Sequence, residues 1–165
     1  IWRGTRKDAI RSVEDGLTTI IRDDLSGRVE DVNVVFLKLL LDTGHTPVLT
    51  PPAITHDGIA INVDADRAAA ATAAALGAAE LLLLSNVPGV LRDHTDPASL
   101  ITSISADNLE TARDAAKGRM KNKVLAAEEA LAAGVPRVII GSANGDHPIA
   151  AARNGAGTHF EGALA

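Results

Sequence analysis

The chain has 165 residues, 46% apolar and 22% charged, which is the balance of a soluble globular protein, and we expect residues 1–165 to form a single domain. A net charge of -5 and an aromatic content of 2% argue against binding to nucleic acid, which uses cationic surfaces or stacked aromatic rings. The absence of cysteine excludes disulfides, thiolate metal sites and a cysteine nucleophile, and no apolar run reaches membrane length. We therefore expect a cytoplasmic protein that contacts no membrane.

The first half of the chain is predicted to begin with a hairpin. β-Branched residues favour a strand at 17–22, and a turn leads into a returning strand at 28–33. Asp31 is expected to cap a helix that Gly44 closes, and a short buried strand is expected at 46–50. The apolar positions that fit a buried face of this helix are Val34, Val35, Leu37, Leu40 and Leu41.

Strands and helices alternate in the second half. A helix of mostly alanine ends at Gly77, and the apolar run at 80–85 is typical of a parallel strand buried on both faces. Ser105 is expected to cap a helix that runs toward Lys117. The pattern further predicts a loop at 92–99, a helix at 119–134, a strand at 136–143, a short helix at 147–155 and an edge strand at 157–160. The alternation predicts an α/β fold with an open, mostly parallel sheet and helices on both faces.

A cluster of polar side chains separates a strand from the alanine-rich helix. Asn62, Asp64 and Asp66 stand at alternate positions there. Either acid could cap the helix, because a carboxylate accepts hydrogen bonds from the free N–H groups of a helix N-terminus. One cap needs only one residue, however, and ligands of open α/β sheets sit at the strand-to-helix edge. A capping role and a ligand-binding role therefore both stay open.

A second cluster, in the segment 118–124, places three cations at the start of a helix that Gly118 opens: Arg119, Lys121 and Lys123. Cations oppose the helix dipole at this end, but they would help to bind a polyphosphate. A solvated basic turn is the simpler interpretation, and we prefer it for Lys121. Lys123 precedes an apolar run, so its stem is expected to lie along the core with the ammonium projecting into a cleft.

A turn of sequence Ser-Asn-Val-Pro-Gly, residues 85–89, follows the apolar strand. An ordinary turn is the simpler interpretation. The alternative is a loop at the edge of a nucleotide site, where small side chains permit close approach.

Taken together, these segments resemble a known family. The motifs N-V-D-A-D-R-A-A-A, L-L-S-N-V-P-G-V-L, G-R-M-K-N-K-V-L-A-A-E-E-A-L and G-A-G-T occur in the order found in the C-terminal part of the amino-acid kinase family. The chain looks most like the acetylglutamate kinase branch. Its segments 22–33 and 118–124 are similar to members that act on acetylaminoadipate or on carrier-protein-linked aminoadipate or glutamate. The resemblance extends from about Arg6 to Thr158.

The resemblance implies a role for individual residues. Asn62 would bind the amino-acid substrate, Asp66 would orient the lysines around the transferring phosphoryl group, and Lys123 would stabilise the charge on that group. Asp64 stands where many relatives have Asn, and Asn86 where many have Asp. The residues expected to contact the nucleotide are Ser85, Asn86, Val87, Gly89, Leu91, Gly118 and Met120.

The implied cofactors are ATP and Mg²⁺. Mg²⁺ is expected to be held mainly by the ATP phosphates and water, so no protein ligand is assigned. The histidines lack metal-ligand spacing and are interpreted as surface or loop residues: His45, His56, His94, His147 and His159.

The implied reaction is ATP-dependent phosphorylation of the side-chain carboxylate of an N-blocked acidic amino acid, in arginine or lysine biosynthesis. The alternatives are a catalytically inactive nucleotide-binding or regulatory module, and another amino-acid kinase acting on uridylate, carbamate or aspartate. The family's second lysine, in a K-x-G-G strand, is expected in an N-terminal substrate lobe that this sequence does not contain. We therefore expect this chain alone to be inactive, and the full-length protein to be a homodimer.

Overall fold

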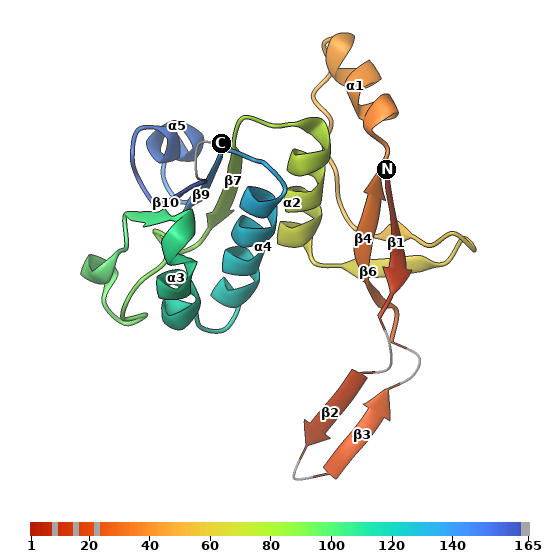
Figure 1. Cartoon of the computed structure of the whole chain (residues 1–165), viewed down its shortest axis with the longest axis horizontal. Coiled ribbons are helices and arrows are strands. Elements are labelled where there is room, and N and C mark those ends of the chain that lie inside the picture. Colours follow the sequence, from red (N-terminus) through yellow and green to blue (C-terminus); the bar gives the residue numbers. More distant parts are fainter. Residues whose placement is uncertain (8–9, 15–16, 22–23, 163–165) are drawn as a thin grey trace. The chain divides into compact units, whose positions relative to one another are not determined.

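The computed structural model describes residues 1–7, 10–14, 17–21 and 24–162. Contacts between Cα atoms divide the chain into two compact units, Ile1–Ala68 and Ala69–Ala165. The strands labelled β1, β4 and β6 in Figure 1 belong to the first unit, and those labelled β7, β9 and β10 to the second. The expectation that residues 1–165 make one domain stays a prediction.

The first unit is built around four short strands that close into a small barrel. In barrel order they are β1 (Trp2–Arg6), β4 (Ser26–Val32), β6 (Ala60–Val63) and β5 (Ala53–Ile54). β1 runs antiparallel to β4, and β4 runs parallel to β6. The sequence predicted no strand before residue 17, yet Trp2 pairs with Val32 in β1 and is buried. Trp2 thus belongs to the buried apolar residues of this unit, together with Val32, Ala53, Ile61 and Val63.

The two strands predicted to pair with each other as a hairpin each pair with another strand. β3 (Leu17–Ile21) pairs antiparallel with β2 (Ile10–Glu14), and the returning strand predicted at 28–33 is part of β4. Residue 22, the last of the predicted strand, and residue 23, the first of the predicted turn, lie outside the described residues. An Asp-Gly pair at 15–16 is a strong hairpin signal that could have identified this pairing from the sequence.

Helix α1 (Val34–Asp42) forms as predicted, but its cap and its buried face were wrongly assigned. The Asn33 side chain accepts the N–H of Phe36 at 3.0 Å, so Asn33, not Asp31, is the cap. Of the predicted apolar face only Leu37 is buried, and Val35 is 82% exposed. Periodicity identifies an apolar face but not what covers it. The described residues of this unit leave most of this face exposed to solvent.

The strand predicted at 46–50 is also absent. These residues have no regular secondary structure, and Val48 is 91% exposed. β-Structure needs a neighbouring strand, and none of the described strands pairs with this segment.

The second unit contains a mixed four-stranded sheet. Its order is β7 (Leu81–Ser85), β9 (Arg137–Ser142), β10 (Thr158–Glu161) and β8 (Ser103–Ser105). β7 and β9 are parallel, as are β10 and β8, whereas β9 and β10 are antiparallel. The strands predicted at 80–85 and 136–143 are confirmed. The strand at 157–160 forms but is not an edge, because the unpredicted β8 pairs with its outer side.

Helices cover both faces of this sheet. α4 (Met120–Ala132) and α3 (Leu109–Ala115) share a core with Val138 and Ile140 of β9, to which α4 contributes small buried alanines. On the opposite face Gly141 lies against Ala152 of α5 (Pro148–Arg153). The predicted α/β class, with helices on both sides of a sheet, is confirmed. None of the described helices is long and apolar enough to cross a membrane.

Ser105 does not cap the helix predicted after it. Its side chain makes no capping bond, and a 3-10 turn, η2 (Ala106–Asn108), separates it from α3. α3 ends at Ala115, before Lys117. The loop at 92–99 forms as predicted and ends in a second 3-10 turn, η1 (Pro97–Ser99).

Candidate functional site

The acidic cluster lies in the first unit, where β6 leads into α2 (Ala65–Leu76). Asp64 accepts the N–H of Arg67 at 3.1 Å and is therefore the residue that caps α2. Asn62 is exposed, and its backbone N–H donates to the carbonyl of Leu25 at 2.7 Å. Asp66, in the first turn of α2, is half-buried. Asp64 thus provides the capping hydrogen bond of α2, and this bond does not involve the side chain of Asp66.

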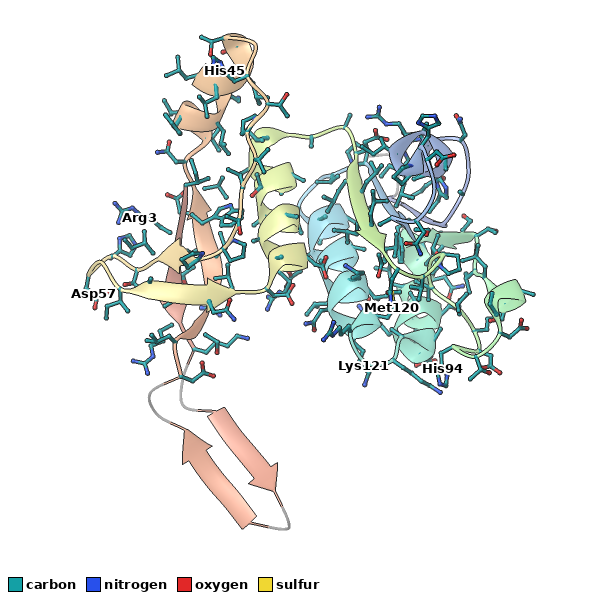
Figure 2. The ribbon with its side chains drawn as sticks, turned by 180° about the vertical axis from the view of Figure 1, so that it is seen from behind. Arg3, His45, Asp57, His94, Met120 and Lys121 are labelled. Atoms are coloured by element: carbon teal, nitrogen blue, oxygen red, sulfur yellow. The ribbon has the colours of Figure 1, made fainter. Side chains whose placement is uncertain are left out.

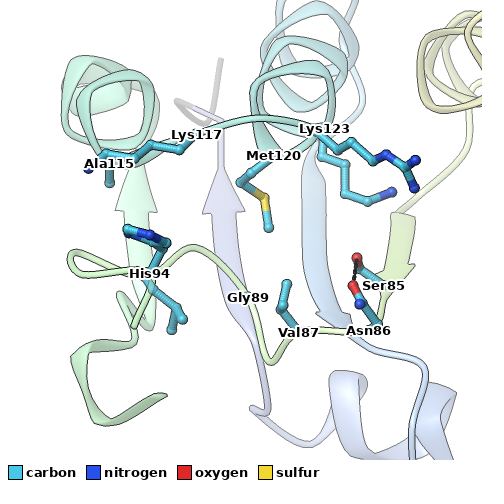
Figure 3. Close-up of a pocket in the computed structure, with 11 residues that line it drawn as sticks. Ser85, Asn86, Val87, Gly89, His94, Ala115, Lys117, Met120 and Lys123 are labelled. Carbon is cyan, nitrogen blue, oxygen red and sulfur yellow. Dashed lines mark hydrogen bonds between the residues drawn. The ribbon is translucent and has the colours of Figure 1, made fainter. Parts of the chain in front are cut away.

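A pocket of about 200 Å³ lies in the second unit, where β7 ends at Ser85 (Figure 3). All of the residues predicted to contact a nucleotide line it except Gly118, and Lys123 lines it as well. Its full lining is Ser85, Asn86, Val87, Gly89, Leu91, His94, Ala115, Lys117, Arg119, Met120 and Lys123. Two motifs far apart in the sequence therefore meet at one hollow, while their binding of a nucleotide stays a prediction.

Gly118 stands in the turn between α3 and α4 and does not line the pocket. Its φ of +53° is the left-handed conformation that glycine adopts without strain. A Cβ placed there would meet no atom within 4 Å, so this position is restricted by backbone conformation and not by space. Gly118 consequently sets the direction in which α4 starts.

The floor of the pocket is fixed to strand β10. A Cβ at Gly89 would lie 2.6 Å from Thr158 Oγ1, which shows how closely the loop approaches this strand. The next residue, Val90, donates its N–H to the same hydroxyl at 2.8 Å, and both residues are fully buried. The Ser-Asn-Val-Pro-Gly turn is thus held by a buried hydrogen bond that connects residues far apart in sequence.

One end of the pocket has the character of an anion site. Lys123, Ser85 and Asn86 lie there together (Figure 3), with Lys123 half-buried in the first turn of α4. The N–H groups of Met120 and Lys121 already donate to the carbonyls of Lys117 and Gly118, at 3.1 and 3.3 Å. The start of a helix still carries a partial positive charge, and this charge, an ammonium and a hydroxyl are suited to phosphate oxygens.

Lys121 differs from Lys123 in its surroundings. It is exposed on the surface of α4 (Figure 2) and lines a separate hollow near Arg113 and Glu128, whose ion pair is 2.7 Å long. The interpretation of Lys121 as a solvated residue agrees with this position. Arg119 is exposed but lines the same pocket as Lys123.

His94, Ala115 and Lys117 form the opposite end of the pocket (Figure 3), and the sequence had indicated none of them as site residues. His94 lies on the loop 92–99, which a bridge between Leu91 and Leu100 closes. No local sequence pattern marks it, because only the fold brings this loop beside α3.

Asp93 stands beside His94 but does not line the pocket. Its carboxylate accepts the backbone N–H of Thr95 at 2.9 Å and the Thr95 hydroxyl at 2.7 Å. These bonds, together with the nearby charges of His94 and Lys117, hold the pKa of Asp93 below its ordinary value. The carboxylate therefore stays ionised at neutral pH and partly offsets the cations around it.

Within the described part of the chain, no group of three or more histidine, aspartate or glutamate side chains comes together as a metal site. The assignment of Mg²⁺ to phosphates and water stays a prediction.

A mixed α/β sheet covered by helices, with a pocket at the carboxyl end of a strand, is the arrangement in which α/β proteins place their ligand sites. Comparison with known sequences identifies the family. The chain matches the amino acid kinase family over residues 6–142, and it belongs to that family.

Curated relatives include two LysW-aminoadipate kinases and an acetylglutamate kinase. A LysW-aminoadipate kinase from Deinococcus radiodurans is 55% identical over 158 residues, covering 96% of this chain and 54% of the relative. A LysW-aminoadipate kinase from Thermus thermophilus is 45% identical over 160 residues, covering 96% of this chain and 60% of the relative. An acetylglutamate kinase from Methanopyrus kandleri is 40% identical, covering 72% of this chain and 49% of the relative. The chain thus spans about half the length of these relatives.

Solved structures agree on the fold. N-acetylglutamate synthase from Neisseria gonorrhoeae, complexed with coenzyme A and L-arginine, has a TM-score of 0.75 and 26% identity, over 96% of this chain and 37% of that one. Carbamate kinase from Giardia lamblia bound to AMP-PNP has a TM-score of 0.70 and 22% identity, over 93% of this chain and 52% of that one. The predicted amino-acid kinase fold is confirmed.

Proposed function

We propose that the protein to which this chain belongs is an ATP-dependent carboxylate kinase. Its substrate is the side-chain carboxylate of an N-blocked acidic amino acid, and we favour aminoadipate linked to a carrier protein. The observation that carries this choice is the 55% identity, over 96% of the chain, to a LysW-aminoadipate kinase. Acetylglutamate and acetylaminoadipate are the alternative substrates. They differ by one methylene, which a pocket distinguishes by only ~1–3 kcal/mol.

The reaction moves one phosphoryl group. The bond between the γ-phosphorus and the bridging oxygen of ATP breaks, a bond from that phosphorus to a carboxylate oxygen forms, and the products are ADP and an acyl phosphate. The carboxylate is already ionised, so no general base is required. Catalysis is then mainly positioning and neutralisation of charge.

The residues of this chain divide that work. Lys123, half-buried at the start of α4, would neutralise charge on the migrating phosphoryl group. Asp66 would orient the cations, and Asn62 would bind the amino-acid part of the substrate. Asp66 lies in the first unit and Lys123 in the second, so the role of each residue is a separate part of this proposal. Mg²⁺ would travel with ATP and neutralise part of the phosphate charge.

The test uses the full-length protein with ATP, Mg²⁺ and each candidate acceptor in turn. Hydroxylamine converts an acyl phosphate into a hydroxamate, which is measured by its colour with ferric ion. We expect hydroxamate in proportion to ADP, with the highest kcat/KM for the carrier-linked aminoadipate. Equal or better turnover of free acetylglutamate would assign the protein to the arginine-forming branch instead.

A nucleotide-binding module without catalysis is the second candidate. It is distinguished by ATP binding, measured by calorimetry, without hydroxamate from any acceptor. Phosphorylation of uridylate, carbamate or aspartate in place of these acceptors would mean a different amino-acid kinase. We expect the protein to act in the cytoplasm as a homodimer.

A further inference from the structure

We propose that His94 is the residue that holds the base of the bound nucleotide, by stacking its imidazole ring on the base. This inference rests on the proposed use of ATP. It concerns the end of the pocket that lies away from Lys123, for which the sequence had suggested no function.

The pocket has two chemically different ends. Lys123, Ser85 and Asn86 form one end, His94 and Lys117 lie at the other, and Met120 and Val87 lie between them (Figure 3). A nucleoside triphosphate has the same division, because it joins a polyanion to a flat and largely uncharged ring.

Charge sets the direction of the nucleotide. The Lys123 end combines an ammonium with the positive end of α4, and both favour phosphate. At the other end the ionised Asp93 carboxylate lies 3.8 Å from His94 Nδ1 and close to Lys117. Asp93 does not line the pocket, but its carboxylate offsets the ammonium of Lys117, which does. Phosphate is therefore favoured more at the Lys123 end, and the base is assigned to the His94 end.

The side chains at the His94 end of the pocket are suited to hold a stacked base. Ala115 lies at this end of the pocket (Figure 3), and Leu91, which is buried, lines the pocket as well. His94 is the one ring-bearing side chain among the residues that line it, in a chain with 2% aromatic residues. Its side chain is 65% exposed, so one ring face can be covered by a ligand without displacing protein atoms. Stacking of a base on a flat ring is worth ~1–3 kcal/mol, or about fivefold to 150-fold in affinity.

The experiment compares a ligand that has a base with one that lacks it. Dissociation constants of ATP and of inorganic tripolyphosphate, each with Mg²⁺, are measured by calorimetry on the full-length protein. We expect His94→Ala to weaken ATP about tenfold while tripolyphosphate binds as before. His94→Phe, which restores a flat ring, should recover ATP affinity to within about threefold of the wild-type value. His56→Ala, an exposed histidine that does not line the pocket, is the matched control and should change neither constant.

Two results would overturn the inference: unchanged ATP affinity in His94→Ala, or an equal loss for ATP and tripolyphosphate, which would place His94 at the phosphates. Thermal melting of each variant separates loss of binding from loss of fold. If the wild type forms no hydroxamate but His94→Ala selectively loses ATP affinity, His94 is upheld as the contact to the base and the proposed kinase activity is rejected. Absence of binding of either ligand to the wild type would reject both proposals.

Discussion

At the scale of single residues, Lys121 and Lys123 provide an internal comparison. They stand two positions apart on α4, and only Lys123 lines the pocket. We predict that Lys123→Ala lowers kcat of the full-length enzyme on the order of 100-fold or more, because it removes a cation placed beside developing charge. Lys121→Ala should stay within about twofold, as expected for a surface residue outside the pocket. Steady-state kinetics of hydroxamate formation provide the measurement, and equal losses in the two variants would refute the assignment of Lys123.

Thr158 illustrates how a residue outside the pocket supports it. Its buried hydroxyl accepts the N–H of Val90 at 2.8 Å. Thr158→Val keeps the shape but leaves that N–H without its acceptor, at a cost of about 1–3 kcal/mol. Thr158→Ser keeps the hydroxyl and should lose less. Urea unfolding of the two variants checks this, and a Val variant at least as stable as the Ser variant would contradict it.

At the scale of elements, Glu80 joins two strands and a helix of the second unit. It precedes β7 and accepts hydrogen bonds from Arg137 of β9, at 2.6 Å, and from Arg153 of α5. Burial of the carboxyl opposes its ionisation, but the bonds and charges of the two arginines outweigh burial, so the pKa of Glu80 lies below its ordinary 4.5. The native state therefore favours the ionised form.

This difference in pKa predicts how stability depends on pH. A lowered native pKa adds stability that is present above pH 4.5 and is lost as the pH falls through the native value. Glu80→Gln should cost about 1–2 kcal/mol at pH 7. Its deficit relative to the wild type should shrink as the pH falls below 4.5. Urea unfolding of both proteins between pH 7 and about pH 3 measures the deficit. A deficit that does not change with pH would show that the charge of Glu80 contributes nothing.

The elements that could be predicted are those whose sequence pattern is complete in itself. The apolar runs of β7 and β9 and the alanine-rich α4 were located to within two residues. β8 and the interior place of β10 were missed, because a three-residue strand has no periodicity and sheet order depends on distant pairing. The motifs at 85–91 and 118–124 contain eight of the eleven residues that line the pocket, whereas His94, Ala115 and Lys117 became visible only in the fold.

At the scale of the whole molecule, the first unit carries an apolar surface that the sequence had assigned to a core. Val35 and Leu41 of α1 are exposed, and so is Val48 in the segment predicted as a buried strand. The chain spans about half the length of its curated relatives, so the activity belongs to the full-length protein and has to be tested there.

The most direct test of the central claim is a crystal structure of the full-length protein with Mg²⁺ and a non-hydrolysable ATP analogue. The account predicts the terminal phosphate within about 3.2 Å of Lys123 Nζ, with the base against His94. A nucleotide bound outside this pocket, or one whose phosphates lie at the His94 end, would contradict it.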